Sequence, residues 1–346
     1  MNNSGIILVL AYPETIVRLA IEWYSPLLRI IGLGKKGYIR AGHAALVLIN
    51  KETKALDYYD FGRYITPGLN GRVRSKETDC ELDFPLKADV VDGKLKNTKE
   101  ILHFLGVNPE LTHGDGDLYA SVCNEIDYDL AKKFIFEMQE TYFIRYAAFK
   151  KGATNCARFV TDTIIASTTN DEIRERLIES NKFTPSTLGN TVLSDTEKMI
   201  YIVSQKGEFS EYTPPKKWHN IKANAQFFID RLKGHSQSFE GTTKPKKVEG
   251  VAKHAQWLGG IGSGAWFELS KTNKKEEFRF RRISPYRLDT DAIFNVNDLS
   301  FDYDKEYMFN HESNCSFCHI KQGNKIFRFD FVRKFDANSV PLEHSA

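Results

Sequence analysis

Cys156 is a cysteine whose position in the sequence favours reactivity. It lies in the stretch TNCARFVTDTIIAST, residues 154–168, where a loop gives way to a predicted helix. If Thr154 or Asn155 caps this helix, the thiol lies in the first turn, where free backbone N–H groups and the helix dipole favour a thiolate. A thiolate is the nucleophilic form of cysteine, and the same N–H groups can stabilise an oxyanion. The alternative is a small buried residue with no reactive role.

A general base for this thiol is offered by His43, which opens the apolar run HAALVLIN at residues 43–50. The run predicts a buried strand, and a histidine at its start either bonds to the backbone or faces a cleft at the strand's end. In a cleft, the imidazole could take the proton of a cysteine thiol. The simpler interpretation is a strand-end histidine bonded to the backbone.

Asp60 is the residue best placed to orient that histidine. If the loop KETK has four residues, the hairpin register pairs Ala45 with Asp60. Side chains of one face recur every second residue, so Asp60 lies diagonally from His43 on the same face. A carboxylate there could hold the imidazole as the third member of a triad does. A one-residue slip of the register would favour Asp57 instead.

Three further residues are candidates for contacts with a substrate. Asn155 precedes the cysteine, Tyr12 follows the first predicted strand, and Arg63 lies in the Gly-rich stretch FGRYITPGLNGRVRS with Arg72 and Arg74. Arginines in a cleft bind carboxylates or phosphates, whereas exposed loop arginines are the simpler interpretation of this stretch.

Residues 1–205 contain both strand patterns and helix patterns, which predicts an α+β domain. The strands and helices of this domain must position the candidate residues. The predicted strands are residues 6–12, 43–50, 54–61, 142–149 and 198–204. The predicted helices are residues 13–31, 98–105, 127–141 and 156–168, the third of them capped by Asp127.

A change of composition predicts a second domain. Residues 206–250 read as a helix, at 220–232, followed by a polar linker that contains Gly and Pro. Residues 251–346 contain almost only strand patterns, and the last hairpin turns at Gly323-Asn324. We therefore expect a smaller, mainly-β accessory domain, with protease cleavage near residues 233–250 leaving two stable fragments.

The N-terminus contains no recognisable secretion signal, because no Lys or Arg precedes its short apolar run and no cleavage site follows. Charged residues interrupt residues 13–31, so no window is apolar enough to span a membrane. Contact of that helix with a membrane surface is the less favoured alternative to a core or lid element. We expect a cytoplasmic protein.

The charge balance argues against a nucleic-acid partner. The chain has 346 residues, with 48 Lys and Arg against 45 Asp and Glu, and its formal net charge is +3. Its basic runs, at residues 242–250 and 271–282, occur in polar or mixed-charge sequence and are typical of solvated faces.

The five cysteines predict neither a disulfide framework nor a metal site. CSFCH, residues 315–319, has the form that attaches c-type haem, but it lies in a predicted hairpin where Cys315 and Cys318 would point to opposite faces. No second cysteine pair completes a zinc site. We expect reduced thiols, no metal and no cofactor.

The order GHAALVLI, then YYDFG, then a helix, a strand and TNCARFV resembles the circularly permuted papain-like superfamily, in which the histidine strand precedes the cysteine helix. Permuted relatives of NlpC-type cell-wall peptidases and lecithin retinol acyltransferase-like proteins share this order. The resemblance covers roughly residues 5–205. The GHAALVLIN and YYDFG pattern is also similar to that of uncharacterised Bacteroidota proteins.

The resemblance implies a permuted papain-like domain in which Cys156 is the nucleophile, His43 the base and Asp60 the orienting residue. Asp60 departs from the acyltransferases, which have a histidine in the third position. The expected reaction is hydrolysis of a peptide, amide or acyl-ester substrate by a cysteine hydrolase. The alternatives are acyl transfer by the same fold and a non-catalytic binding or scaffold protein with an inert Cys156.

Overall fold

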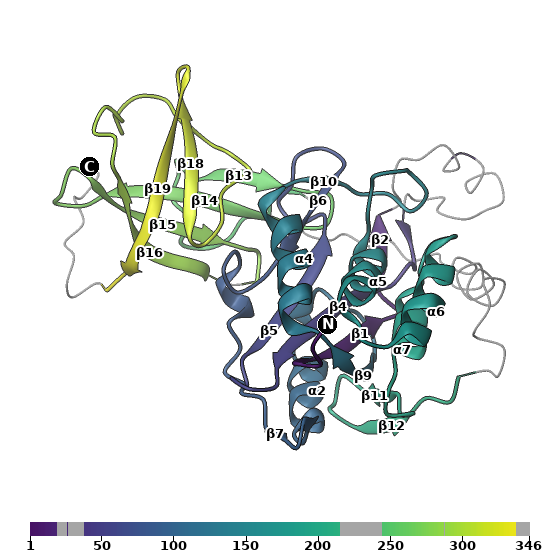
Figure 1. The fold of residues 1–346 in the computed structure, drawn as a ribbon. Helices are drawn as coiled ribbons and strands as arrows, with labels where there is room; N and C mark the ends of the chain where they lie inside the picture. The colour runs from purple at the N-terminus through teal and green to yellow at the C-terminus, as the bar shows by residue number, and fades with distance from the viewer. Residues whose placement is uncertain (19–25, 27–37, 215–243, 287, 337–346) are drawn as a thin grey trace. The chain divides into compact units, whose positions relative to one another are not determined.

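The computed structural model of the chain describes residues 1–18, 26, 38–214, 244–286 and 288–336 (Figure 1). It divides into two compact units. The N-terminal unit comprises Met1–Gly62, Leu69–Ser75 and Phe84–Phe239, and the C-terminal unit comprises Arg63–Gly68, Lys76–Asp83 and Glu240–Ala346. The predicted fold class, an α+β domain followed by a mainly-β domain, is confirmed. The helix predicted at residues 220–232 and the centre of the predicted linker lie outside the described residues.

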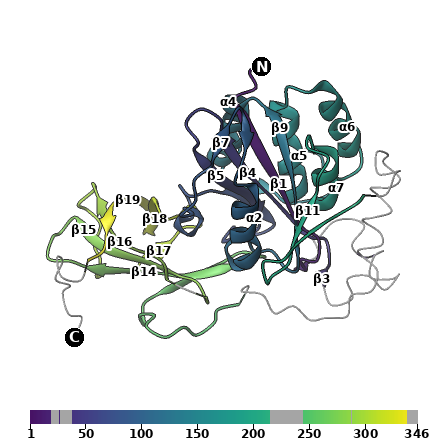
Figure 2. The same cartoon turned by 90° about the horizontal axis from the view of Figure 1, so that it is seen from below.

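An eight-stranded antiparallel sheet organises the N-terminal unit (Figure 2). The apolar sequences of its central strands explain their position, because a strand covered on both faces needs apolar residues throughout; every residue of GIILVLAY, for example, is buried. In spatial order the strands are β10 (Ile144–Arg145), β6 (Asn70–Arg74), β5 (Leu56–Gly62), β4 (His43–Asn50), β1 (Gly5–Tyr12), β9 (Leu118–Ile126), β11 (Tyr201–Val203) and β12 (Phe209–Glu211).

The hairpin of β4 and β5 has the predicted register. The N–H of Asn50 donates to the carbonyl of Ala55, at 3.0 Å, and Ala45 pairs with Asp60. Two short hairpins complete the strands of this unit, β2 (Val17–Arg18) with β3 (Tyr38–Ile39), and β7 (Val90–Val91) with β8 (Lys94–Leu95).

Helices pack against the sheet through an apolar cluster that joins β1, β4 and β5 to four helices. Figure 1 shows these helices in front of the strands. They are α4 (Tyr128–Glu140), α5 (Cys156–Ser167), α6 (Asp171–Asn181) and α7 (Thr187–Leu193). Asp127 caps α4 as predicted, because its Oδ1 accepts from the N–H of Leu130 at 3.1 Å. Two more helices, α2 (Thr98–Val107) and α3 (Pro109–Thr112), follow the β7–β8 hairpin.

Several parts of the N-terminal unit differ from the prediction, and β6, α3, α6 and α7 are among the elements that the sequence analysis does not predict. Val17 and Arg18, expected in a helix over residues 13–31, form a strand, and most of that segment lies outside the described residues. The strand expected at residues 142–149 contracts to Ile144–Arg145, and Tyr142 has a left-handed φ of 57°, which ends α4 and interrupts an extended chain. The central strand β9 was not predicted.

The C-terminal unit is a seven-stranded antiparallel sheet with an aromatic core. In spatial order its strands are β13 (Gln256–Gly259), β14 (Gly264–Lys271), β15 (Glu277–Ile283), β16 (Leu288–Val296), β19 (Lys325–Lys334), β18 (Phe317–Gln322) and β17 (Met308–Phe309). The side chain of Gln256 links the two ends of this order, since its amide donates to the carbonyl of Tyr307 and accepts from the N–H of Phe309. The sheet is therefore nearly closed.

An isolated turn of 3-10 helix, η1 (Cys80–Leu82), belongs to the same unit although it precedes the strands of its sheet by more than 150 residues in sequence. It contacts β16.

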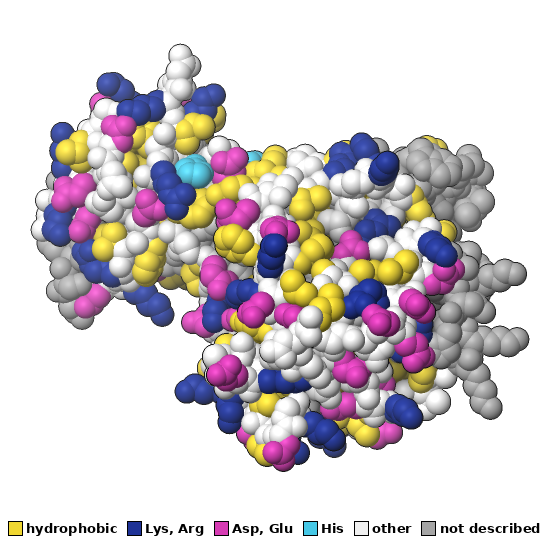
Figure 3. All heavy atoms as spheres, viewed as in Figure 1, with side chains coloured by type: hydrophobic (Ala, Val, Ile, Leu, Met, Phe, Trp, Pro, Cys, Tyr) yellow, Lys and Arg dark blue, Asp and Glu magenta, His cyan; other side chains and the backbone are white. Residues whose placement is uncertain are grey.

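Acidic and basic side chains are interspersed on the face drawn in Figure 3, as the near balance of charge predicts. Among the described residues, none of the helices has the length and apolar character needed to cross a membrane.

Candidate active site

Cys156 is the first residue of α5, as the sequence predicts. Asn155 caps the helix: its Oδ1 accepts from the N–H of Arg158 at 2.9 Å, and its Nδ2 donates to the carbonyl of Ala147 at 3.4 Å. Both polar atoms of the Asn155 amide therefore hold the loop that leads into the helix, which explains why this residue precedes the cysteine.

The thiol of Cys156 lies among three hydrogen-bonding groups. These are the imidazole of His43, the backbone N–H of Ala44, and the hydroxyl of Tyr146, whose oxygen is 3.8 Å from Sγ. Burial alone would raise the pKa of the thiol, since only 6% of the residue is exposed, but the contacts with His43, Ala44 and Tyr146 lower that pKa below its ordinary value. The surroundings therefore favour a thiolate.

His43 begins β4 and contacts both a thiol and a carboxylate. Its Nε2 lies 3.3 Å from Oδ2 of Asp60, and the thiol of Cys156 is near enough to shift the pKa of the same ring. Burial by itself would lower the pKa of the imidazole, yet the bonds to Asp60 and Cys156 outweigh it and raise the pKa to about 9. The surroundings therefore favour the charged form of the imidazole and lower the pKa of the thiol beside it.

Asp60 is fully buried and held on several sides. Arg74 donates from Nε to Oδ1 at 3.0 Å and from Nη2 to Oδ2 at 2.6 Å, and the hydroxyl of Tyr58 donates to Oδ2 at 3.0 Å. Burial would raise the pKa of this carboxyl, but Arg74 and His43 hold it well below its usual range. These contacts favour the charged, carboxylate form of Asp60.

The alternative third residue, Asp57, has a different partner. Its Oδ2 lies 3.2 Å from Nζ of Lys132 on α4, and it pairs with Leu48 across the hairpin. The register that brings Asp60 to His43 thus directs Asp57 to a helix.

Tyr12 lies next to this cluster, opposite His43 in the pairing of β1 with β4. The residue is fully buried, and its hydroxyl donates to the carbonyl of Leu105 at 3.2 Å. Burial raises the pKa of the phenol well above its usual value. The observed contacts are those of a neutral packing residue, and a contact with substrate stays a prediction.

Arg63 belongs to the C-terminal unit, unlike the other candidates. It is buried, and its carbonyl accepts from the N–H of Gly262 at 2.9 Å. The loop arginine is therefore not exposed, and its role toward a substrate stays a prediction.

Three residues of this cluster were not assigned their positions from the sequence: Tyr58, Arg74 and Tyr146. Tyr58 could have been found, because it lies two residues before Asp60 and so shares its face. Arg74 pairs with Asp60 across β5 and β6, but residues 63–69 between those strands do not fix the register in the way that a tight turn does. Tyr146 reaches the thiol from a short bridge with Thr154, which no periodic pattern indicates.

The remaining cysteines lie apart from this cluster in the chain. Cys123 is buried in β9 and Cys318 in β18, and burial raises the pKa of both thiols. Cys315 precedes β18 rather than lying in it. Within the described ranges, no three His, Cys, Asp or Glu side chains are grouped closely enough to hold a metal ion.

Comparisons with known proteins match two separate parts of the chain. Residues 7–173 match the family described as type VI secretion system effector TseH-like, and residues 255–332 match the DUF6695 C-terminal domain. Among solved structures, a crystal structure of the type VI secretion system effector TseH is 16% identical over an alignment that covers 62% of this chain and 100% of that chain, with a TM-score of 0.39. No curated protein sequence matches. The first half of the chain, including Cys156, His43 and Asp60, is thus similar to the TseH-like type VI effectors.

Proposed function

We propose that the chain is a cysteine hydrolase with a circularly permuted papain-like N-terminal domain. The observation that carries the proposal is the contact of Cys156, at the start of α5, with His43, whose other side faces the buried carboxylate of Asp60. The match of residues 7–173 to TseH-like effectors supports it, because that segment includes all three residues.

The proposed reaction begins with the thiolate of Cys156, which attacks the carbonyl carbon of the substrate. Since Nε2 of His43 faces Asp60, Nδ1 is the ring nitrogen left for the thiol and the substrate. The imidazolium gives its proton to the leaving group, and the neutral ring then takes a proton from the water that hydrolyses the thioester. Asp60 keeps the ring oriented and stabilises its charged form.

The backbone N–H groups in the first turn of α5 would stabilise the oxyanion. Asn155 supports this arrangement through its cap, so we assign it a positioning role rather than contact with substrate. The substrate class that we propose is a peptide-type amide, including the stem peptides of cell walls, with acyl esters as the alternative.

Activity-based labelling with an acyl-directed thiol probe tests the mechanism. We expect modification at Cys156 that is absent in Cys156→Ala and falls about 10²–10⁴-fold in His43→Ala, the usual contribution of a general base. Asp60→Asn should weaken labelling, whereas Asp57→Asn is the matched control, since it alters a buried aspartate of the same strand that bonds to Lys132. Labelling at another cysteine, or labelling that does not depend on His43, would overturn the mechanism.

A panel of substrates separates the reactions. Release of an amine from peptide amides supports peptidase activity, and release of an alcohol supports esterase activity. Appearance of an acylated acceptor in place of free acid would assign acyl transfer instead.

A non-catalytic scaffold is the second candidate, because Cys156 is mostly buried and belongs to the apolar cluster beneath the sheet. Alkylation by iodoacetamide distinguishes the two. An activated thiolate reacts rapidly below pH 7, whereas an inert buried thiol reacts slowly in the native protein.

We also propose that the hydrolase is made in the cytoplasm and delivered by a type VI secretion system, on the strength of the match to TseH-like effectors. The test compares its release from cells with an active and an inactivated secretion apparatus. Equal release from both would refute delivery by this route.

A further inference from the structure

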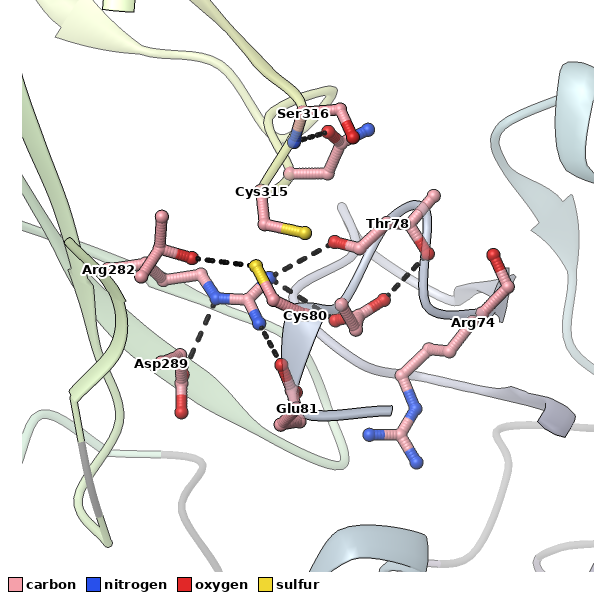
Figure 4. Close-up of polar contacts among 12 residues, drawn as sticks. Arg74, Thr78, Cys80, Glu81, Arg282, Asp289, Cys315 and Ser316 are labelled. Atoms are coloured by element: carbon pink, nitrogen blue, oxygen red, sulfur yellow. Dashed lines mark hydrogen bonds and ion pairs between the residues drawn. The ribbon is translucent and has the colours of Figure 1, made fainter. Parts of the chain in front are cut away.

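Two cysteines of the C-terminal unit, far apart in sequence, lie against each other. Cys80 lies in η1, and Cys315 lies two residues before the start of β18. Figure 4 shows the sulfur atoms of Cys80 and Cys315 beside each other, and each thiol is the largest single influence on the pKa of the other. Two neighbouring thiols are the starting arrangement for a disulfide.

The backbone around Cys315 is fixed to the segment that carries Cys80. The N–H of Cys315 donates to the carbonyl of Thr78 at 3.1 Å, and the hydroxyl of Ser316 donates to the carbonyl of Glu77. Sγ of Cys315 itself lies 3.8 Å from that carbonyl oxygen. Hydrogen bonds to main-chain carbonyls therefore keep Cys315 next to the segment that carries Cys80.

Arg282 of β15 holds the same segment from another direction (Figure 4). Its guanidinium lies 3.2 Å from Oδ1 of Asp79 and 2.7 Å from Oε2 of Glu81, the two neighbours of Cys80. It is almost fully buried and also pairs with Asp289 at 3.4 Å. Ion pairs on both sides of Cys80 leave this residue little freedom to move away from Cys315.

The two thiols differ in character. The neighbouring thiol of Cys315 lowers the pKa of Cys80 to about 7. Burial opposes this shift, while the hydroxyl of Thr290, 3.5 Å away, and the charge of Arg282 assist it. The neighbouring Cys80, together with burial, raises the pKa of Cys315 well above its ordinary value. Cys80 is also the more exposed of the two. Cys80 is thus suited to attack and Cys315 to act as the second thiol.

We propose that Cys80 and Cys315 are a redox-active pair that closes to a disulfide by exchange with a small disulfide such as oxidised glutathione. The Cys80 thiolate attacks one sulfur of glutathione disulfide, forms a mixed disulfide and releases one glutathione thiolate. Cys315 gives up its proton, attacks the Cys80 sulfur and releases the second glutathione. Two protein thiols are oxidised and one glutathione disulfide is reduced to two glutathione thiols.

The disulfide would join Lys76–Asp83 covalently to the start of β18. Both segments belong to the C-terminal unit, so the bond would reinforce contacts that already exist rather than create new ones. The proposal is independent of the proposed hydrolase, because it uses neither Cys156 nor His43.

Redox titration of the full-length protein tests the proposal. The protein is equilibrated in mixtures of oxidised and reduced glutathione, quenched with acid, alkylated and mapped by mass spectrometry. We expect a peptide that links Cys80 to Cys315, with the mass of two hydrogen atoms lost, and a midpoint that defines a reduction potential. Cys315→Ser should instead accumulate glutathione on Cys80, and Cys80→Ser should leave Cys315 reduced.

Cys123→Ser provides the matched control, because Cys123 is a buried thiol with a raised pKa in the other unit, and this variant should titrate like the wild type. Thermal unfolding of the oxidised and reduced wild type gives a second readout that needs no substitution, with a higher midpoint expected for the oxidised form. A stable mixed disulfide on wild-type Cys80, a cross-link to another cysteine, or no oxidation of either thiol would each overturn the proposal.

Discussion

At the residue scale, charges alternate along the path that ends at the thiol. Arg74 is cationic and Asp60 is anionic. When the thiol has given its proton to the imidazole, His43 is cationic and Cys156 is anionic. The positive charge of Arg74 therefore weakens the attraction of the Asp60 carboxylate for the imidazole proton. It acts through Asp60 as a positioning residue that limits the rise of the His43 pKa.

The pH profile of Arg74→Met tests this arrangement. In the proposed mechanism the rate falls on the acid side when Cys156 is protonated and on the alkaline side when His43 loses its proton, at about pH 9. Without the guanidinium, Asp60 attracts the imidazole proton more strongly, so the alkaline limb should move above 9. Breaking this buried ion pair should also cost about 3–5 kcal/mol of unfolding free energy.

Arg74→Lys separates the charge effect from loss of structure. Lysine keeps the positive charge but cannot form both bonds of the guanidinium, so its alkaline limb should stay near that of the wild type while stability falls. A limb that moves equally in both variants would show that the fork geometry, not the charge, controls the imidazole.

At the element scale, the start of α5 depends on Asn155. Removing such a cap destabilises a protein by about 1 kcal/mol, so Asn155→Ala should lower the unfolding free energy by that amount and reduce labelling of Cys156. Asn155→Ser keeps an oxygen that can accept from Arg158 and should retain most of both. If the serine variant were stable but had a strongly raised KM, Asn155 would contact the substrate after all.

The β4–β5 hairpin shows which features of the site can be predicted from sequence. A loop of known length between two apolar runs fixes the register, and the register fixes which aspartate accompanies His43. The capped helix that begins at Cys156 was likewise predictable, because Asn155 is a strong cap ahead of an apolar periodicity.

Other elements depend on contacts that the local sequence does not indicate. The strand β9, LYASVCNEI, mixes Ser, Asn and Glu with its apolar residues and carries no clear period, yet it pairs with β1 in the middle of the sheet. The segment of Val17 and Arg18 has an apolar spacing typical of a helix, but these residues pair with Tyr38 and Ile39. Pairing with a distant strand overrode local preference in both cases.

At the scale of the whole molecule, the C-terminal unit includes two short segments that lie within the α+β domain in sequence. Residues 255–332 match a domain family by themselves, but the unit also contains Arg63–Gly68 and Lys76–Asp83. The buried Arg282 depends on the latter segment for two of its carboxylate partners, Asp79 and Glu81.

We therefore expect a fragment of residues 244–346 to be much less stable than the same residues in the full chain, which replaces the expectation from composition that cleavage near residues 233–250 leaves two stable fragments. The fragment keeps Asp289 beside Arg282 but loses Asp79 and Glu81, and incomplete pairing of a buried charge typically costs about 3–5 kcal/mol. Denaturant unfolding measures the difference. Arg282→Met within the fragment is the control and should recover part of the loss; a fragment that unfolds like the full chain would contradict the argument.

The order of synthesis gives the divided C-terminal unit a further consequence. The ribosome makes a chain at about 5–20 residues per second, and Arg282 follows Lys76–Asp83 by about 200 residues. For roughly 10–40 seconds, Asp79, Cys80 and Glu81 have left the ribosome while the sheet that receives them does not yet exist. The N-terminal unit can complete its sheet during this interval, so the C-terminal unit is the last part of the nascent chain to fold.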